Sequence, residues 1–413
     1  MKKKIVIIGG GTGGIMAASQ LRIALPKEEI VIVEPSDTHY YQPAWTLVAA
    51  GTYSFERTSK PMLKMIPEGV KWIQDSVQNI SPKNNQIITY MGERIAYDYL
   101  IVSPGLKNAL HMVEGAEEAL QTDHACSIYT DPVHSKNVIE NFNGGVALFT
   151  QANTPIKCGG APQKIMYLAE DIFRANQIAD KSKIVFASPG SKIFGVKEIA
   201  ETLMKVVDRK KINLRFGHVL KRIDSKNRIA WYTLNDNHSE YNHHTIDQRV
   251  DGDLVGIHYD MLHFGPPQMA PEFVTASGLA NEQGWMKVNI HTLQHETYKN
   301  IFGIGDVVAL PTAKTGAAIR KQVPVVIDHI KSMIKANGKS NAAYNGYSSC
   351  PLVTGIGKMV LAEFNYENKF TPDPKLKQML VFDSHKEHWR LWILKKYILP
   401  YLYWNKMMKG KQV

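Results

Sequence analysis

The sequence predicts an α/β protein with two Rossmann-like βαβ domains and a C-terminal amphipathic, membrane-associating segment. At the start of the 413-residue chain, a glycine-rich motif between a short apolar run and a helical pattern predicts the first domain. A second alternation of strand-like and helix-like patterns in the middle of the chain predicts the other domain. The last residues combine aromatic, apolar and basic side chains, which is typical of a segment that lies in a lipid interface.

The glycine motif stands in the order strand, turn, helix, strand. Lys4–Ile8 is a β-branched apolar run long enough for one buried strand, and it leads directly into the turn Gly9–Gly14. Ile15–Leu25 follows with a helical pattern, and Glu29–Val33 is a second apolar run, ending at Glu34. A glycine-rich turn alone is a weak signal, but this order around it predicts a dinucleotide-binding unit.

Gly9, Gly11 and Gly14 fill the spacing G-x-G-x-x-G. Such glycines let the backbone approach a pyrophosphate, and the helix N-terminus behind them offers free N–H groups and the positive end of its dipole. Glu34 stands where a carboxylate binds a ribose hydroxyl. We therefore expect these four residues to bind the ADP part of a cofactor.

The composition, with 44% hydrophobic and 21% charged residues, is that of a soluble globular protein. The formal charge of +11 suits an anionic partner, and since no nucleic-acid-binding signature accompanies it, we predict no nucleic acid partner and weigh a membrane surface instead. No apolar run reaches the roughly 20 residues of a transmembrane helix. We interpret the basic start Met1–Lys4 as the beginning of the first strand and not as part of a signal peptide.

No metal site is predicted. The three cysteines show no C-x-x-C or zinc-type spacing and no disulfide framework. The remaining metal candidates are histidines without cysteine or carboxylate partners at ligand spacing, and we interpret them as surface polar residues. They are His238, His243, His244, His385 and His388.

A second mononucleotide-type unit follows in outline. Its predicted strands and helices are Gly145–Thr150, Lys164–Arg174, Lys183–Ala187, Val196–Lys210 and Asn213–Phe216. The turn at Ser188–Gly195 lacks the glycine spacing and carries Pro189 where a backbone should cradle a diphosphate. We interpret this as a degraded nicotinamide fingerprint, which makes NADH or NADPH a poor electron donor.

Other segments complete the first domain. Val70–Ile73, Gln86–Tyr90 and Glu93–Ala96 are predicted strands of a small inserted sheet. Tyr97–Val102 is a buried strand that stops at Ser103-Pro104-Gly105, a second tight backbone approach. Late in the chain come the strand Ile301–Ile304, the motif Gly305-Asp306, the helix Thr315–Lys335 bent at Pro324, and a closing region, Gly346–Lys411.

Two nucleotide-binding-like halves with a late Gly-Asp motif describe FAD/NAD(P)-type, disulfide-reductase-like flavoproteins. The predicted division assigns residues 1–110 and 291–340 to an FAD-binding domain in two parts. Residues 111–290 are the second Rossmann-like domain, and residues 341–413 are a C-terminal region for a redox cysteine and membrane attachment.

Two of the three cysteines stand in segments that favour a redox role. Cys158 lies just before a predicted helix, where the helix N-terminus, Lys157 and Lys164 would stabilise a thiolate. Cys350 lies in the turn-like stretch Ser348–Leu352, beside proline and small residues. Buried inert cysteines are the alternative for both, and for Cys126 we favour it.

The C-terminal segment Trp389–Lys409 is too charged, and too broken by Pro400, to span a bilayer. Its aromatic and basic residues favour an interfacial position on anionic lipid. The alternative is a helix packed on the protein's own core or in a dimer interface.

Five segments spread over essentially the whole chain carry a family signature. They are His39–Ala44, Asn153–Tyr167, Tyr298–Thr315, Tyr347–Phe364 and Leu399–Gly410. By these segments the chain resembles sulfide:quinone oxidoreductases of the type that includes the mitochondrial enzyme. The resemblance implies FAD, a sulfur-handling pair of Cys158 and Cys350, and active-site lysines at Lys164 and Lys395. It also implies that ubiquinone or menaquinone accepts the electrons on the opposite face of the flavin.

Further partners follow from the resemblance: hydrogen sulfide as substrate, a small sulfur acceptor (thiol, sulfite or sulfide), a membrane surface and a possible homo-oligomer. We expect a peripheral membrane protein, on the cytoplasmic membrane if the source is bacterial. The expected cofactor-binding residues are Gly9, Gly11, Gly14, Glu34, Gln42, Gly105, Gly305, Asp306 and Lys314.

One departure from the family concerns a third cysteine, which in some members holds FAD covalently. Tyr129 fits that position better than Cys126, so we predict non-covalent FAD. A type II NADH:quinone dehydrogenase is an alternative, which would need an intact second fingerprint and no cysteine pair. A non-catalytic FAD-binding scaffold or sensor is another.

Overall fold

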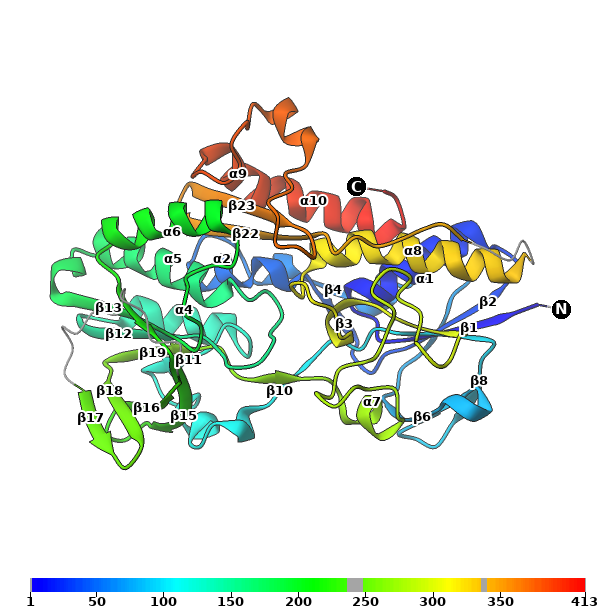
Figure 1. The fold of residues 1–413 in the computed structure, drawn as a ribbon, viewed down its shortest axis with the longest axis horizontal. Coiled ribbons are helices and arrows are strands. Elements are labelled where there is room, and N and C mark those ends of the chain that lie inside the picture. Colours follow the sequence, from blue (N-terminus) through cyan, green and yellow to red (C-terminus); the bar gives the residue numbers. More distant parts are fainter. Residues whose placement is uncertain (1, 236–247, 336–339, 413) are drawn as a thin grey trace.

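The computed structural model describes residues 2–235, 248–335 and 340–412. Two α/β halves lie side by side, and the C-terminal region lies across the top of both (Figure 1). His238, His243 and His244 lie outside the described residues, as does the end of the polar stretch Asp224–Glu240. The described part of this stretch forms the turn and the second strand of a hairpin between His218–Asp224 (β15) and Ile229–Leu234 (β16).

The right-hand half in Figure 1 is built on a parallel sheet with the strand order β21-β9-β1-β2-β5. The central strand β1 is buried from Ile5 to Ile8, as expected for a parallel sheet covered on both faces. The helices α1 (Thr12–Ala24) and α8 (Gly316–Ile334) pack against each other, and α8 continues through Pro324. The strands are β1 (Lys4–Ile8), β2 (Glu29–Val33), β5 (Lys71–Ile73), β9 (Tyr99–Val102) and β21 (Ile301–Gly303).

The prediction for Val70–Ile73 was wrong about its partner. Strand β5 pairs in parallel with β2 at the edge of the main sheet and does not join the small antiparallel sheet. A run of three residues carries no pattern that identifies its partner, whereas parallel pairing is set by the crossover connection before it. The small sheet consists of β6 (Val77–Ser81), β7 (Gln86–Thr89) and β8 (Arg94–Ala96).

The left-hand half is built on a parallel sheet with the strand order β11-β19-β12-β13-β14. Four of its strands, β19-β12-β13-β14, repeat the order β9-β1-β2-β5 of the first sheet, whereas the edge strand β11 precedes the others in the chain. Its strands are β11 (Ala125–Cys126), β12 (Gly145–Thr150), β13 (Ser182–Ser188), β14 (Asn213–Phe216) and β19 (Met261–Phe264). Its helices are α3 (Ala116–Ala119), α4 (Pro132–Asn141), α5 (Ala161–Ala175) and α6 (Lys197–Arg209). An antiparallel sheet of β15 (His218–Asp224), β16 (Ile229–Leu234), β17 (Gln248–Asp251) and β18 (Leu254–His258) lies below it.

This topology shows that the second dinucleotide turn lies at another place in the chain than the sequence predicted. Strand β12 leads through α5 into its neighbour β13, as β1 leads through α1 into β2. The counterpart of the first glycine turn is therefore residues 151–160, between β12 and α5, and not Ser188–Gly195. The prediction that placed the degraded fingerprint at Ser188–Gly195 was therefore wrong, because this turn lies one βα unit later in the chain. The correct turn also lacks G-x-G-x-x-G, and it contains Cys158.

Short elements complete the fold. They are β3 (Thr38–Tyr40), α2 (Trp45–Ala49), β4 (Ser59–Pro61), β10 (Lys107–Asn108), β20 (Gln268–Met269) and α7 (Glu272–Ala276). Side chains between Ala270 and Val288 pack in the core of the first half, which favours a return to that half before residue 290. The predicted boundaries at 110, 290 and 340 stay a prediction.

The C-terminal region is a hairpin followed by a nearly continuous helix. Strands β22 (Ser348–Gly355) and β23 (Lys358–Phe364) pair, and β22 packs on α5. The helix runs from α9 (Trp389–Ile393) through the π-helical turn Leu394–Ile398 to α10 (Leu399–Asn405), and the 3₁₀ turn Met407–Lys409 follows. Among the described residues, no helix has the length and apolar character needed to cross a membrane.

Candidate functional site

The first glycine turn has the shape its sequence requires. Gly9 adopts φ +95°, and a Cβ on Gly14 would lie 1.8 Å from the Gly9 carbonyl oxygen, so only glycine allows β1 and α1 to approach so closely. Gly11 caps α1, and no side chain bonds the first N–H groups of the helix. The turn therefore presents free donors and a positive dipole end.

The space in front of this turn fits a dinucleotide. A Cβ on Gly11 or on Gly105 would meet no atom within 4 Å, so both backbones face open space. The Glu34 carboxylate is fixed at the end of β2, where it accepts hydrogen bonds from the N–H groups of Gly10 (2.6 Å) and Ser36 (2.8 Å). A ribose hydroxyl arriving there would meet an oriented carboxylate.

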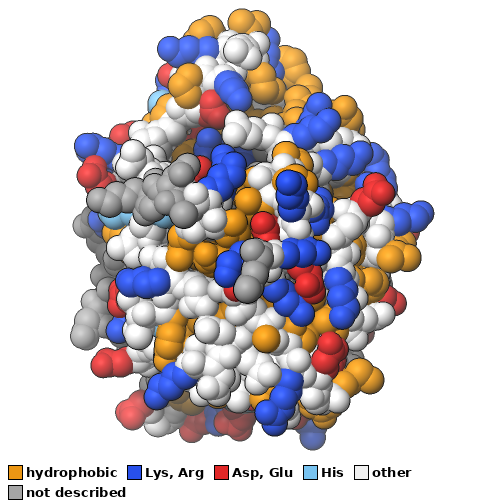
Figure 2. Space-filling view, turned by 90° about the vertical axis from the view of Figure 1, so that its right-hand side faces the viewer, with side chains coloured by type: hydrophobic (Ala, Val, Ile, Leu, Met, Phe, Trp, Pro, Cys, Tyr) orange, Lys and Arg blue, Asp and Glu red, His pale blue; other side chains and the backbone are white. Residues whose placement is uncertain are grey.

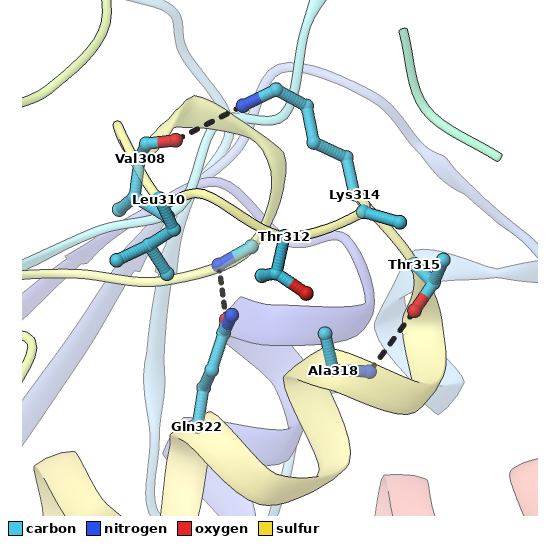
Figure 3. A pocket seen from close by; sticks show the side chains of 9 residues that line it. Val308, Leu310, Thr312, Lys314, Thr315, Ala318 and Gln322 are labelled. Carbon is cyan, nitrogen blue, oxygen red and sulfur yellow. Dashed lines mark hydrogen bonds between the residues drawn. The ribbon is translucent and has the colours of Figure 1, made fainter. Parts of the chain in front are cut away.

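A second edge of this region lies at the start of α8 (Figure 3). The Lys314 ammonium donates to the carbonyl oxygens of Asp306 (2.6 Å) and Val308 (3.0 Å), and it lies 4.1 Å from the centroid of the Trp285 ring. Burial lowers the pKa of Lys314 to about 8 and raises the pKa of Asp306 above its usual range. The Gly305 N–H donates to Gln322 (2.8 Å), so the Gly-Asp turn is tied to the helix.

The two cysteines meet above the start of α5. Cys158 adopts φ +52°, and its N–H donates to the Lys314 carbonyl (2.8 Å), which joins the cysteine loop to the Gly-Asp edge. Cys350 comes from β22, and its sulfur would lie 2.9 Å from a Cβ on Gly160. Since any side chain at Gly160 would displace that sulfur, this glycine lets the two cysteines approach.

Charge in this pair is divided unequally. The pKa of the Cys158 thiol is held well below its usual range by a hydrogen bond from Cys350 and by the Lys164 ammonium, whose Nζ lies 2.8 Å from the sulfur. Together these two effects lower the pKa of Cys158 by more than burial raises it. The pKa of Cys350 is raised by the same hydrogen bond and by burial. Cys158 is therefore the thiolate and Cys350 the thiol of the reduced pair.

Lys395 completes the cationic side of the pair. It is buried in the π-helical turn of the C-terminal helix, and its ammonium donates to the Pro43 carbonyl (2.7 Å). Burial and the nearby Lys164 charge lower its pKa to about 8, although both cysteines act in the opposite direction. Gln42, next to Pro43, is exposed and has no hydrogen bond from its side chain within the part of the chain that the structure describes.

Several residues near the site escaped the sequence analysis. The Tyr403 hydroxyl lies 2.6 Å from Nε2 of His39 and 2.8 Å from Oγ1 of Thr12, and His39 Nδ1 lies 2.9 Å from the Gly10 carbonyl oxygen. The C-terminal helix is thereby bound to the glycine turn. The segments His39–Ala44 and Leu399–Gly410 had been noticed, but nothing in either one indicated contact between them.

Tyr129 and Cys126 have different surroundings. The Tyr129 hydroxyl donates to the Cys158 carbonyl (3.2 Å), which places this tyrosine beside the cysteine pair. Cys126 is fully buried in the core of the second half, and burial raises its pKa to about 12. A thiol of this kind is an inert packing residue. Within the described residues, no group of three or more histidine, cysteine or acidic side chains could hold a metal ion.

Comparison with known proteins gives close relatives. The model of the pyridine nucleotide-disulphide oxidoreductase family matches residues 3–139. The mitochondrial sulfide:quinone oxidoreductase of Mus musculus is 37% identical over 98% of this chain and 86% of its own length, and that of Dictyostelium discoideum is 39% identical over 99% and 86%. The structure of the Aquifex aeolicus sulfide:quinone oxidoreductase has the same fold, with a TM-score of 0.80 at 21% identity over 99% of this chain and 92% of that one.

The open space at Gly11 leads to a prediction about cofactor binding. The variant Gly11→Val should fold, because the backbone there is extended and no described atom lies near the new Cβ, yet its side chain should block a pyrophosphate. We expect a folded protein that purifies without flavin, measured by visible absorbance and thermal melting. Full flavin content in this variant would place the dinucleotide elsewhere.

The unequal pair predicts a pH profile for thiol alkylation. With the protein reduced, Cys158 should react with iodoacetamide at pH 6–7, because its pKa is depressed and the thiolate persists as the pH falls. Lys164→Met should move the half-point of the profile to higher pH and lower the alkylation rate at pH values below the half-point, by about tenfold for each unit by which the pKa rises. Peptide mapping should find the label on Cys158. An unchanged profile in Lys164→Met would show that Lys164 does not stabilise the Cys158 thiolate.

Proposed function

The chain belongs to the sulfide:quinone oxidoreductase family, and we propose that it oxidises hydrogen sulfide through Cys158 and Cys350 and delivers the electrons through FAD to a membrane quinone. It is an oxidoreductase of the flavoprotein type. The observation that carries the proposal is the cysteine pair held between Lys164 and Lys395 at the second dinucleotide turn.

The residues of the first half fit FAD. Gly9, Gly11 and Gly14 would admit the pyrophosphate, Glu34 would bind the ribose, and Gly105 would allow a close approach from the next strand. Gly305, Asp306 and Lys314 form the edge that the Cys158 loop contacts, so they would bind the cofactor on the side of the cysteines. Gln42 stays a predicted contact. FAD, when bound, would supply a two-electron acceptor for the reduced pair and a donor for quinone.

The sulfur chemistry follows from the unequal pKa values. In the oxidised pair, hydrosulfide attacks the Cys350 sulfur, since the thiolate of lower pKa is the better leaving group and Cys158 has that pKa. One S–S bond breaks and another forms, which leaves a persulfide on Cys350 and a thiolate on Cys158. The Lys164 ammonium, 2.8 Å from this sulfur, stabilises the negative charge as it appears.

The product leaves by a second exchange. A small acceptor (thiol, sulfite or sulfide) takes the outer sulfur of the persulfide, and Cys350 is released as a thiolate that is protonated because its pKa is high. Lys395, with a pKa of about 8, can supply that proton near neutral pH. Restoring the disulfide from the Cys158 thiolate and the Cys350 thiol then removes two electrons and one proton from the pair.

Quinone access and membrane attachment are proposed for the C-terminal helix. Its outer face carries Trp389, Ile393, Tyr397 and Tyr401 at four-residue spacing, exposed to 55%, 36%, 54% and 58%. Its inner face is packed on the protein, as the alternative interpretation of this segment expected. The interpretation as a packed helix therefore describes the inner face, and the interpretation as an interfacial segment describes the outer face. We call the four exposed residues of the outer face the aromatic stripe, and their composition is that of an interfacial anchor.

The alternatives find less support. The turn that precedes α5 lacks the glycine spacing that an NADH-dependent quinone dehydrogenase would need, and Cys158 is part of it. A non-catalytic flavin-binding protein would have no use for a thiolate stabilised by a buried ammonium. Non-covalent FAD agrees with the deep burial of Cys126.

The cysteines provide the decisive test. The yellow protein, mixed anaerobically with sulfide, should bleach within seconds, whereas NADH should have little effect. Cys158→Ser and Cys350→Ser should keep flavin and lose sulfide-driven bleaching by about three orders of magnitude or more, because a hydroxyl cannot take part in thiol–disulfide exchange. Cys126→Ser is the control, expected to react normally. Normal bleaching in all three variants would end the sulfide proposal, and bleaching by NADH would favour the dehydrogenase.

The aromatic stripe gives a test of attachment. Deleting the segment would remove core residues such as Tyr403 and Trp404, so point variants are cleaner. Tyr397→Ser/Tyr401→Ser should weaken vesicle binding roughly 100-fold, which corresponds to about 3 kcal/mol for two side chains. Bleaching by sulfide should stay normal. If this variant floats with liposomes as the unaltered protein does, the stripe is not the anchor.

A further inference from the structure

A cleft of about 840 Å³ lies between the second half of α1 and the C-terminal turn Met407–Lys409. Its size is that of a ligand site. Four cations and one exposed carboxylate line it together with apolar side chains. The charged residues are Arg22, Lys60, Lys64, Lys409 and Glu68.

The positive charges of the lysines in this cleft repel one another. Burial and the charges of Lys409 and Lys64 lower the pKa of Lys60, whose ammonium also lies 4.5 Å from the centroid of the Trp404 ring. None of these three lysines forms an ion pair with any residue that the structure describes. Unpaired cations gathered around one cavity favour an anionic ligand.

The Arg22 end of the cleft lies away from the cofactor turn. Arg22 follows Thr12 by ten positions, which places it about 15 Å along α1 from the start of the helix. Lys60 lies closer to the turn, because it pairs with His39, whose ring contacts the Gly10 carbonyl oxygen. A pyrophosphate bound at the N-terminus of α1 would therefore leave the Arg22 end of the cleft free.

The cleft adjoins the aromatic stripe instead. Trp404, Met408 and Lys409 follow Tyr401 within the same C-terminal segment. Ile23, exposed to 66%, lines the cleft, and Leu63, exposed to 72%, directly precedes the lining residue Lys64 in the chain. In Figure 2, lysine and arginine side chains gather with hydrophobic ones along the upper right of the face shown. A protein lying on its stripe would hold such a cleft near the level of lipid headgroups.

We propose that this cleft binds the phosphate headgroup of an anionic membrane lipid, whose apolar part lies along Ile23 and Leu63. The proposal rests on the membrane attachment proposed above and adds a specific contact to it. The apolar rim favours a lipid over a soluble phosphate compound, which would gain nothing from exposed aliphatic side chains.

The test uses dihexanoyl phosphatidylglycerol below its micelle concentration, titrated calorimetrically into the flavin-loaded protein. We expect saturable binding of one lipid per chain. Lys64→Gln/Lys409→Gln should weaken it about 30-fold, the effect of two headgroup charges at about 1 kcal/mol each. Both lysines are exposed, so the variant should keep its flavin and melting temperature.

The matched control is Lys83→Gln/Lys226→Gln, which removes the same charge at exposed sites outside the cleft. Equal weakening in both variants would mean diffuse attraction and overturn the proposal. Inorganic phosphate binding as tightly as the lipid would overturn the lipid assignment. Tyr397→Ser/Tyr401→Ser should still bind the soluble lipid, so failure of the stripe and failure of the cleft give different results.

Discussion

The interaction on which this site depends is that of a buried lysine ammonium 2.8 Å from the sulfur of a half-buried cysteine. Burying Lys164 without a partner would cost several kcal/mol, and burying the Cys158 thiolate alone would be as unfavourable. Together they compensate each other, and the pKa of each is moved toward its charged form. The Lys314 carbonyl accepts the Cys158 N–H and holds the cysteine loop, and the absence of a Cβ at Gly160 leaves room for the Cys350 sulfur.

The position of that loop explains how one fold can serve a different chemistry. In the first half, the turn between β1 and α1 has glycines that leave room for a diphosphate. In the second half, the turn at the same place in the topology holds Cys158, and β22 brings Cys350 over it. The helix N-terminus that would favour a phosphate in one half favours a thiolate in the other. The same electrostatic feature of the α/β fold is thus available for two kinds of anion.

The sequence predicted what local patterns determine. The strands, most helix positions and the glycine turn follow from apolar periodicity and spacing, and Cys158 was identified from its flanking lysine and helix start. The sequence did not predict contacts between distant parts of the chain. Examples are the partner of β5, the contact of His39 with Tyr403, and the position of the Cys158 turn in the topology. Each of these depends on which elements pack together, and no short run of residues records that.

The C-terminal helix connects the exposed aromatic stripe to the cysteine site through a change in helical geometry. In its π-helical turn, Lys395 points inward to Pro43 while Tyr397, two residues later, is exposed on the stripe. The wider turn shifts the phase of the residues that follow, so that Tyr403 reaches His39 and Thr12. One helix therefore joins the aromatic stripe to the glycine turn and to Lys395. In the proposed function, attachment and catalysis would share this element, which is a physical reason for the helix to carry core residues on one face and exposed aromatic residues on the other.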